Sequence, residues 1–287
     1  MGHLTAALAR IWAIVWRVLA FFLVWGVLVA VFLVPLGPRL KVWEQVHPLR
    51  MRLYADFAGA VTMLIATWLA TRFLDRRPFV TIGLAPRRLS SHLALGAMAG
   101  MAWIGISLGM AWMGGWLTYR PGQVFSWAAL LGVGMALVLN VLTQQLILCG
   151  YVLQTIRARA GVPLAMVLAS AMFVGLHAGA FKGSWLPAVN VFVAGFLFCV
   201  AYQLTGQLWF PIGMHVVWNF TLGPMLGLTV SGSQRLGSGW RVFDLAGPAQ
   251  LTGGAFGLEG GLIVTASTCL MLVVVVVTLR RRSAAAR

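Results

Sequence analysis

Long apolar runs follow one another along almost the whole chain, separated by short connections that contain Gly, Pro and Arg. A transmembrane helix needs about 20 predominantly apolar residues, and most of the runs approach that length. Because the runs are uniformly apolar, and a helix satisfies all its backbone groups internally, we expect helices rather than barrel strands. About eight spans are predicted, at residues 11–34, 54–73, 92–117, 127–149, 163–181, 186–204, 208–229 and 258–279.

The composition agrees with this pattern, since 61% of the residues are hydrophobic and only 9% are charged. A soluble domain does not need that balance, so we predict an all-α polytopic membrane protein, with residues 1–287 forming a single transmembrane domain. The first run is too long for the apolar region of a signal peptide, and we interpret it as a retained span. The connection at 230–257 is rich in Gly and Ser and is expected outside the bilayer.

The net charge of +16 arises from 21 Lys and Arg residues against 5 Asp and Glu residues. Most of the basic residues lie in short loops, a placement typical of topology signals and of contact with anionic membrane lipids. We therefore expect lipids and not nucleic acid as partners. Basic residues are more numerous on the side that holds both termini, which predicts a multi-pass plasma-membrane protein with cytoplasmic termini. Arg17 falls inside the first span and is expected to snorkel to the interface.

Polar side chains gather in the spans between residues 140 and 220. A polar residue at membrane depth can merely hydrogen-bond neighbouring helices, at about 0.6 kcal/mol per contact, or it can mark a functional site. For a single residue we favour the structural role, and for the whole set we favour a common pocket. The set comprises Asn140, Gln144, Gln145, Asn190, Phe173 with His177, and His215 with Asn219. In each of the last two pairs the residues are four apart and therefore share a helix face.

The order of "FVGLH" at 173–177 and "HVVWN" at 215–219, after the glutamine pair, resembles the CAAX-processing and bacteriocin-processing intramembrane protease family (CPBP, ABI). The resemblance covers about residues 140–225 and places a family core at 127–229. It implies an intramembrane metalloendopeptidase of the CAAX type, a hydrolase that acts on membrane-anchored or prenylated peptides. It also implies a membrane-embedded site in which a water is activated with a metal. The corresponding motif positions here are Gln144, Gln145, His177, His215 and Asn219.

The first motif departs from the family, which has Glu-Glu-x-x-x-Arg where this chain has Gln144, Gln145 and Cys149. A carboxamide is not basic, and general-base assistance is worth roughly 10²–10⁴ in rate. Only His177 and His215 remain as strong metal ligands, whereas catalytic zinc sites usually have three. We therefore expect no tightly bound cofactor, and zinc only if the family site is retained. The loss of both members of a Glu–Arg pair favours divergence to a neutral site, and deliberate Glu-to-Gln replacement is the alternative.

None of the five acidic residues lies between residues 92 and 240. We interpret Asp56 and Glu259 as acids at helix starts, and an inward orientation of Glu259 is the alternative. Three functions stay open. The first is an intramembrane endopeptidase with reduced or no hydrolytic activity. The second is a pseudoenzyme that binds lipidated or transmembrane peptides, or a partner protein, as a membrane scaffold. The third and weakest is a transporter or scaffold with an unrelated polar pocket.

Overall fold

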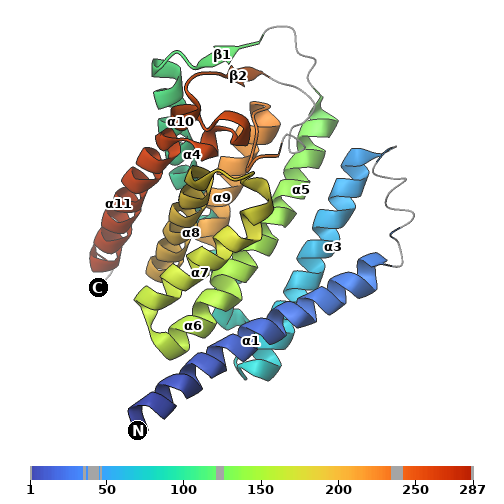
Figure 1. Ribbon diagram of the computed structural model, residues 1–287, viewed down its shortest axis with the longest axis vertical. Coiled ribbons are helices and arrows are strands. Elements are labelled where there is room, and N and C mark those ends of the chain that lie inside the picture. Colours follow the sequence, from blue (N-terminus) through green and yellow to red (C-terminus); the bar gives the residue numbers. More distant parts are fainter. Residues whose placement is uncertain are drawn as a thin grey trace.

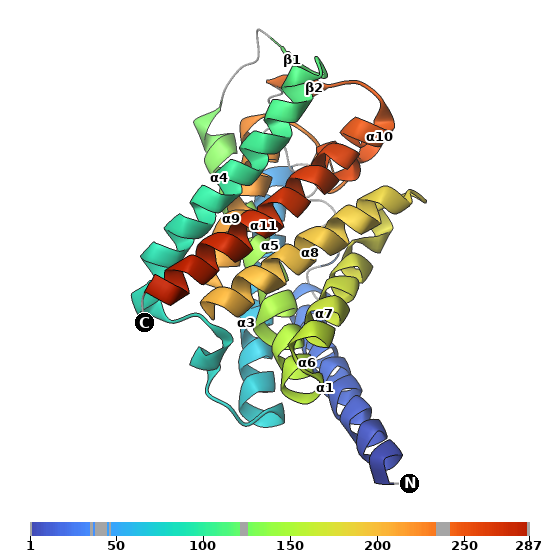
Figure 2. The same ribbon diagram turned by 90° about the vertical axis from the view of Figure 1, so that its left-hand side faces the viewer.

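The computed structural model describes residues 2–34, 37, 45, 47–120, 126–233 and 242–285. Within them, long helices form a tilted bundle, with a small two-stranded sheet at one end (Figure 1). The N-terminus and the C-terminus lie on the side of the bundle away from the strands (Figure 2). The bounds of the long helices are α1 Gly2–Leu33, α3 Pro48–Leu69, α4 Leu89–Met113, α5 Trp127–Gln145, α6 Leu153–Ala160, α7 Val162–His177, α8 Trp185–Thr205, α9 Trp209–Phe220 and α11 Leu262–Ala285.

Short elements connect or extend these helices. Three π-helical segments continue a preceding α-helix, and the others are 3-10 turns, one short α-helix and two strands. Their bounds are η2 Ala70–Leu74, η5 Leu146–Val152 and η7 Thr221–Met225 (π); η3 Phe79–Ile82, η4 Pro86–Arg88, η6 Ala178–Ala180, η9 Gly254–Phe256 and η10 Leu258–Gly260 (3-10); α10 Ala249–Thr252; and β1 Leu117–Tyr119 and β2 Phe243–Leu245.

The all-α polytopic membrane fold predicted from the sequence is confirmed, and the protein is integral to a membrane. Among the described residues, seven helices are long and apolar enough to cross a bilayer. They correspond to seven of the eight predicted spans. The remaining prediction, 208–229, was wrong in length, because α9 ends at Phe220 and only the π-helical η7, which contains Pro224, extends it to Met225. The fourth span is longer than predicted, since α5, η5 and α6 run on without a break to Ala160.

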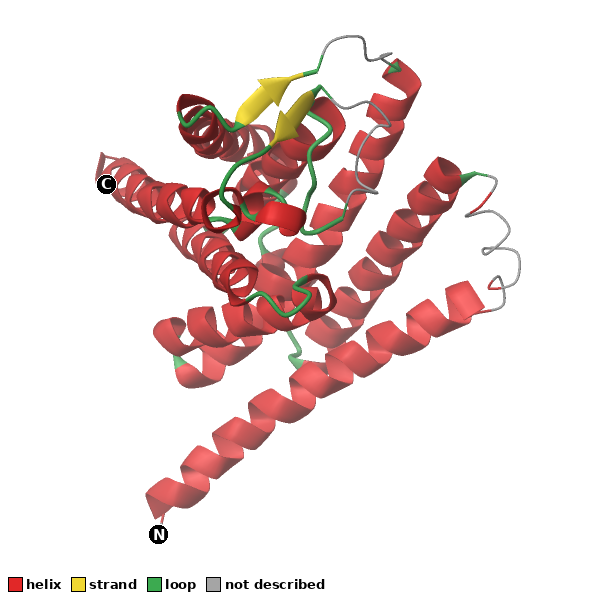
Figure 3. Cartoon of the chain, turned by 45° about the horizontal axis from the view of Figure 1, so that its top comes forward, coloured by secondary structure: helices red, strands yellow, loops and turns green. Residues whose placement is uncertain are grey.

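The predicted connection at 230–257 is partly structured. Strand β2 pairs antiparallel with β1, with Leu117 opposite Leu245 and Tyr119 opposite Phe243. The side chains of Arg120 and Asp244 form an ion pair beside this sheet. Figure 3 shows the two strands side by side at the end of the bundle. Residues 234–241 of the connection lie outside the described part of the chain.

Helices α4 and α9 cross at very short range, because glycines from both helices face the partner's backbone. A Cβ added at Gly96 would lie 2.1 Å from the Phe210 carbonyl oxygen, and one at Gly213 would lie 2.5 Å from that of Leu93. Gly96 and Gly100 form a small-xxx-small motif, which lets transmembrane helices approach closely. Dispersion contacts between such close backbones fix the position of α9, which carries His215.

Candidate intramembrane site

The π-helical segment η5 begins directly after the glutamine pair, within the continuous helix that runs from Trp127 to Ala160. Every residue of η5 is buried, including Cys149, which stands at the arginine position of the family motif. Single π-helical turns inside α-helices occur frequently at functional sites. The polar pair thus lies where the helix changes its winding, and Gln145 is fully buried.

Gln145 and His215 meet across the interface between α5 and α9. The Gln145 Nε2 atom lies 3.2 Å from His215 Nδ1. Because an amide nitrogen only donates, His215 Nδ1 accepts, and the neutral ring then carries its proton on Nε2. The ring of Phe198 stacks on His215 at a centroid distance of 4.8 Å. His215 is thereby held in one orientation by a polar contact and by an aromatic face.

His177 has the opposite tautomer. Its Nδ1 atom lies 2.9 Å from the carbonyl oxygen of Phe173, one turn back on α7. Because a carbonyl only accepts, Nδ1 carries the proton and Nε2 keeps its lone pair. Phe173 packs against both imidazoles, with centroid distances of 4.6 Å to His177 and 6.4 Å to His215. The pair thus offers one ring nitrogen that accepts, on the half-buried His177, and one N–H that donates, on the buried His215.

Gln144 turns away from this contact toward α3. Its Nε2 donates to Asn140 Oδ1 at 2.6 Å, and Asn140 Nδ2 donates to Asp56 Oδ1 at 3.1 Å. Asp56 also pairs with Arg52, whose Nε lies 3.3 Å from Asp56 Oδ2. Because the Asp56 carboxylate only accepts, Asn140 must donate to Asp56 and Gln144 must donate to Asn140. The oxygen Gln144 Oε1 then remains as an acceptor without a partner among the described residues. The interpretation of Asp56 as a helix-start acid was therefore incomplete, because its carboxylate is connected to a motif residue.

Three carboxamide oxygens in this region are buried without a hydrogen-bond partner among the described residues. They belong to Gln144, Gln145 and Asn219. Asn219 lies one turn after His215 on α9 and is 4% exposed. An unpaired buried acceptor is costly, about 1–3 kcal/mol, and such groups are usually satisfied by water or by a ligand. The site thus presents acceptor oxygens, which complement a donor such as a water O–H or a peptide N–H.

Glu259 also differs from its interpretation as a helix-start acid. It belongs to η10, and its carboxylate accepts from Trp218 Nε1 at 2.8 Å and from the backbone N–H and hydroxyl of Ser231. Trp218 lies between His215 and Asn219 on α9, and its ring stacks on Trp103 at 3.9 Å. Burial raises the pKa of the Glu259 carboxyl, and the hydrogen bonds from Ser231 and Trp218 partly oppose that shift. Glu259 therefore links α9, through Trp218, to the segment around Ser231, and it lies before the first residue of α11, Leu262.

Asn190, the remaining polar residue of the spans, has a structural role. Its Nδ2 donates to the carbonyl oxygens of Glu259 and Gly261, and its Oδ1 accepts from Thr265. These contacts join α8 to the turn before α11. A cavity of 480 Å³ lies nearby, beyond the end of α7, and its lining includes Phe181, Lys182, Trp185 and Phe256 but none of the five motif residues.

Within the described residues, no group of three or more His, Cys, Asp and Glu side chains is placed to hold a metal ion. The donor set at this site does not fit the metal that the resemblance to the family implies. His215 Nδ1 already accepts from Gln145, and the remaining oxygens are neutral carboxamides. Catalytic zinc is usually held by three good protein ligands.

Comparison with known proteins gives one match. No curated protein and no solved structure matches this chain significantly. Residues 125–221, however, match the family described as "Type II CAAX prenyl endopeptidase Rce1-like". This segment contains all five motif positions, and the match confirms the resemblance found in the sequence. Over residues 125–221, about a third of its length, the chain is therefore similar to the Rce1-like type II CAAX prenyl endopeptidases.

Proposed function

We propose that this protein is a CPBP-type, endopeptidase-like membrane protein that binds membrane-anchored or prenylated peptides and hydrolyses them slowly or not at all. The family match of residues 125–221 supports the peptide class. The observation that carries the loss of activity is the hydrogen bond from Gln145 Nε2 to His215 Nδ1. A glutamate at position 145 would bring a negative charge and a basic oxygen. The Gln145 carboxamide instead donates an N–H to the lone pair of His215 Nδ1, so that ring nitrogen is no longer available as a base or ligand.

The binding role follows from the groups that remain. The free oxygens of Gln144, Gln145 and Asn219 accept hydrogen bonds, and a peptide backbone offers N–H donors. His177 Nε2 is an acceptor and a weak base without a partner acid. A site with these groups holds a peptide without assembling the charged pair that the family uses. A catalytically inactive pseudoprotease, acting as a membrane scaffold, is the second candidate, and the same neutral pair favours it.

Zinc analysis combined with a cleavage assay tests this proposal. The purified chain is compared with its Gln144→Glu/Gln145→Glu variant, using a prenylated peptide as the substrate. We expect little zinc and little cleavage for the unaltered chain, and a gain of both in the double variant. The triple variant that adds His177→Ala serves as the control and should lose the gain. Near-stoichiometric zinc in the unaltered chain, or cleavage abolished by a chelator, would contradict the proposal.

The topology that accompanies this function is a plasma-membrane protein with both termini in the cytoplasm. The greater number of basic residues in the loops and tails on that side supports it, as does the position of both termini on one side of the bundle (Figure 2). This topology needs α9 with η7 to act as an eighth, shorter crossing beside the seven long helices. A single cysteine added to the C-terminal tail, in a variant that lacks Cys149, Cys199 and Cys269, should resist labelling by an impermeant reagent in intact cells. Labelling without permeabilisation would contradict this orientation.

A further inference from the structure

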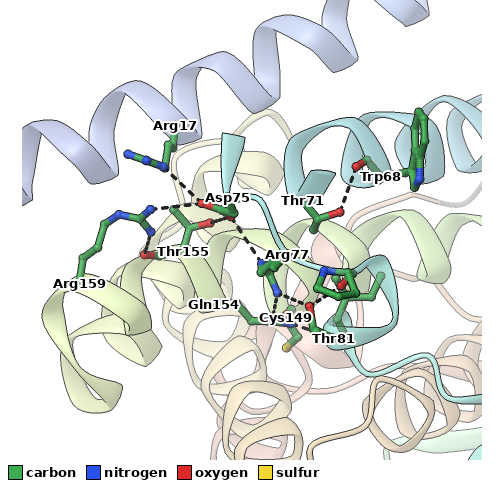
Figure 4. A network of polar contacts seen from close by, with 12 residues as sticks. Arg17, Trp68, Thr71, Asp75, Arg77, Thr81, Cys149, Gln154, Thr155 and Arg159 are labelled. Atoms are coloured by element: carbon green, nitrogen blue, oxygen red, sulfur yellow. Dashed lines mark hydrogen bonds and ion pairs between the residues drawn. The ribbon is translucent and has the colours of Figure 1, made fainter. Parts of the chain in front are cut away.

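Three arginines converge on one carboxylate where α1 crosses the ends of the second and fourth spans (Figure 4). Arg17 Nε and Arg159 Nη2 lie 3.3 and 3.2 Å from Asp75 Oδ1, and Arg77 Nε lies 3.6 Å from Asp75 Oδ2. The Thr155 hydroxyl also donates to Asp75, at 3.4 Å. Arg17, which lies within the first span, therefore joins an ion-pair cluster.

The cluster carries more positive charge than its carboxylate can balance. Three guanidinium groups against one carboxylate leave a net charge of +2. The chain has only five acidic residues. Of the other four, Asp56 pairs with Arg52, Asp244 pairs with Arg120, Glu259 binds Trp218, and Glu44 lies outside the described residues. No second described acid is therefore available to the cluster.

The hydrogen-bond donors of the cluster are also in excess. Arg77 Nη1 donates to Gln154 and Thr81, but Arg77 Nη2 is buried without an acceptor among the described residues. Arg17 Nε faces Asp75 outside hydrogen-bonding geometry. The arginine side chains are 20–22% exposed, whereas Asp75 is 7% exposed, so the open side of the cluster presents guanidinium groups. Such a surface complements an anion with several acceptor oxygens.

The surroundings of the cluster indicate the depth of the membrane headgroups. Asp75 follows η2 at the end of the second span, and Arg159 lies one residue before the end of α6. The Arg17 guanidinium lies over the Trp16 ring, at 4.4 Å. Trp12 and Leu19, on the same helix, are 66% and 62% exposed. Tryptophan and arginine with apolar neighbours are typical of the interface between hydrocarbon and water.

We propose that Arg17, Arg77 and Arg159 form a binding site for a phosphate group, and that an acidic phospholipid supplies this group from the surrounding leaflet. Guanidinium groups bind phosphate oxygens through paired hydrogen bonds, and basic pockets between transmembrane helices bind acidic headgroups. The site lies outside the glutamine–histidine region and does not depend on the function proposed for it. A bound lipid would join α1 to α6 and η2.

The test uses the full chain, purified in a zwitterionic detergent and analysed by native mass spectrometry with phosphatidylglycerol, phosphatidylcholine or inorganic phosphate. We expect selective retention of phosphatidylglycerol, reduced about fivefold for each site arginine replaced by glutamine. Arg17→Gln is the first variant, because α1 lies at the edge of the bundle, and Arg159→Gln is the second. The matched control is Arg87→Gln/Arg88→Gln, which removes exposed charges from another connection.

Asp75→Asn separates a ligand site from a merely structural cluster. It removes the carboxylate that competes with the phosphate, so lipid retention should rise several-fold even if the protein becomes less stable. Competition by millimolar inorganic phosphate would identify a free anion as the ligand and still support the phosphate site. Equal retention of both lipids, or an equal loss in the site and control variants, would overturn the proposal. A fall in retention with Asp75→Asn would overturn it as well.

Discussion

The crossing of α4 and α9 makes Gly96→Ala the most informative single substitution in this chain. The new methyl group would meet backbone, with the Phe210 carbonyl oxygen at 2.1 Å and its carbonyl carbon at 2.9 Å. No rotamer change can relieve a contact with backbone, so the helices must separate by about 1 Å along a close-packed interface. Overpacking of this kind typically costs about 1–3 kcal/mol, and we expect the upper part of that range.

Gly105→Ala is the matched control on the same helix, because a Cβ at Gly105 meets nothing within 4 Å. Both substitutions raise intrinsic helix propensity equally, so their difference isolates the crossing. We expect Gly105→Ala to raise the free energy of unfolding by up to about 1 kcal/mol, whereas Gly96→Ala should lower it. Reversible unfolding by SDS in mixed micelles, followed by tryptophan fluorescence, measures both variants.

A second readout connects this crossing to the candidate site. Separation of α9 from α4 should also disturb the 3.2 Å contact between Gln145 and His215, since α9 carries the histidine. Imidazole resonances of selectively labelled histidine should therefore move for Gly96→Ala and not for Gly105→Ala. Equal stability of the two variants, with unchanged histidine spectra, would refute the reasoning.

Three further predictions follow from the polar contacts. Because burial raises the pKa of Glu259 above its unfolded value, its ionisation disfavours the folded state, and stability should fall as pH rises from about 4 through the raised pKa. Glu259→Gln should remove that fall, and a parallel pH profile in the variant would contradict it. Asn140→Leu leaves the donor of Gln144 and an oxygen of Asp56 without their partner, and should lower the free energy of unfolding by about 2–4 kcal/mol in the SDS titration. Asn190→Leu should cost a similar amount while leaving histidine spectra unchanged, and a shift in those spectra would show that Asn190 belongs to the site.

The sequence predicted the helical membrane fold because apolar run length is a direct consequence of bilayer thickness. It was least accurate at 208–229, where the apolar run continues past the point at which Pro224 interrupts regular α-helical hydrogen bonding. Hydropathy does not register that interruption. The sequence contains Gly96-x-x-x-Gly100, but this spacing alone predicted neither the close crossing nor its partner helix, α9.

For the candidate site, helical spacing correctly suggested that Phe173 and His177 share a face, and the structure places them in contact. It could not reveal that Asp56 reaches Gln144 through Asn140, since that link depends on how α3 packs against α5. The same holds for Glu259, which is distant in sequence from α9 but hydrogen-bonds Trp218. Tertiary packing determines which acidic side chains reach a site. The spacing of residues along the sequence does not predict those contacts.

The π-helical segment Leu146–Val152 has a consequence for how this chain tolerates changes in length. A π turn accommodates one residue more than the α-helical turn that it replaces. Loss of a single residue within 146–152 could therefore be absorbed by rewinding the segment as α-helix, with little change in how α5 and α6 meet their neighbours. The same deletion within Trp127–Gln145 would rotate Gln145 by about 100° relative to the preceding part of α5. Single-residue deletions should therefore be tolerated in the π-helical segment Leu146–Val152 and damaging in the preceding α-helical segment Trp127–Gln145.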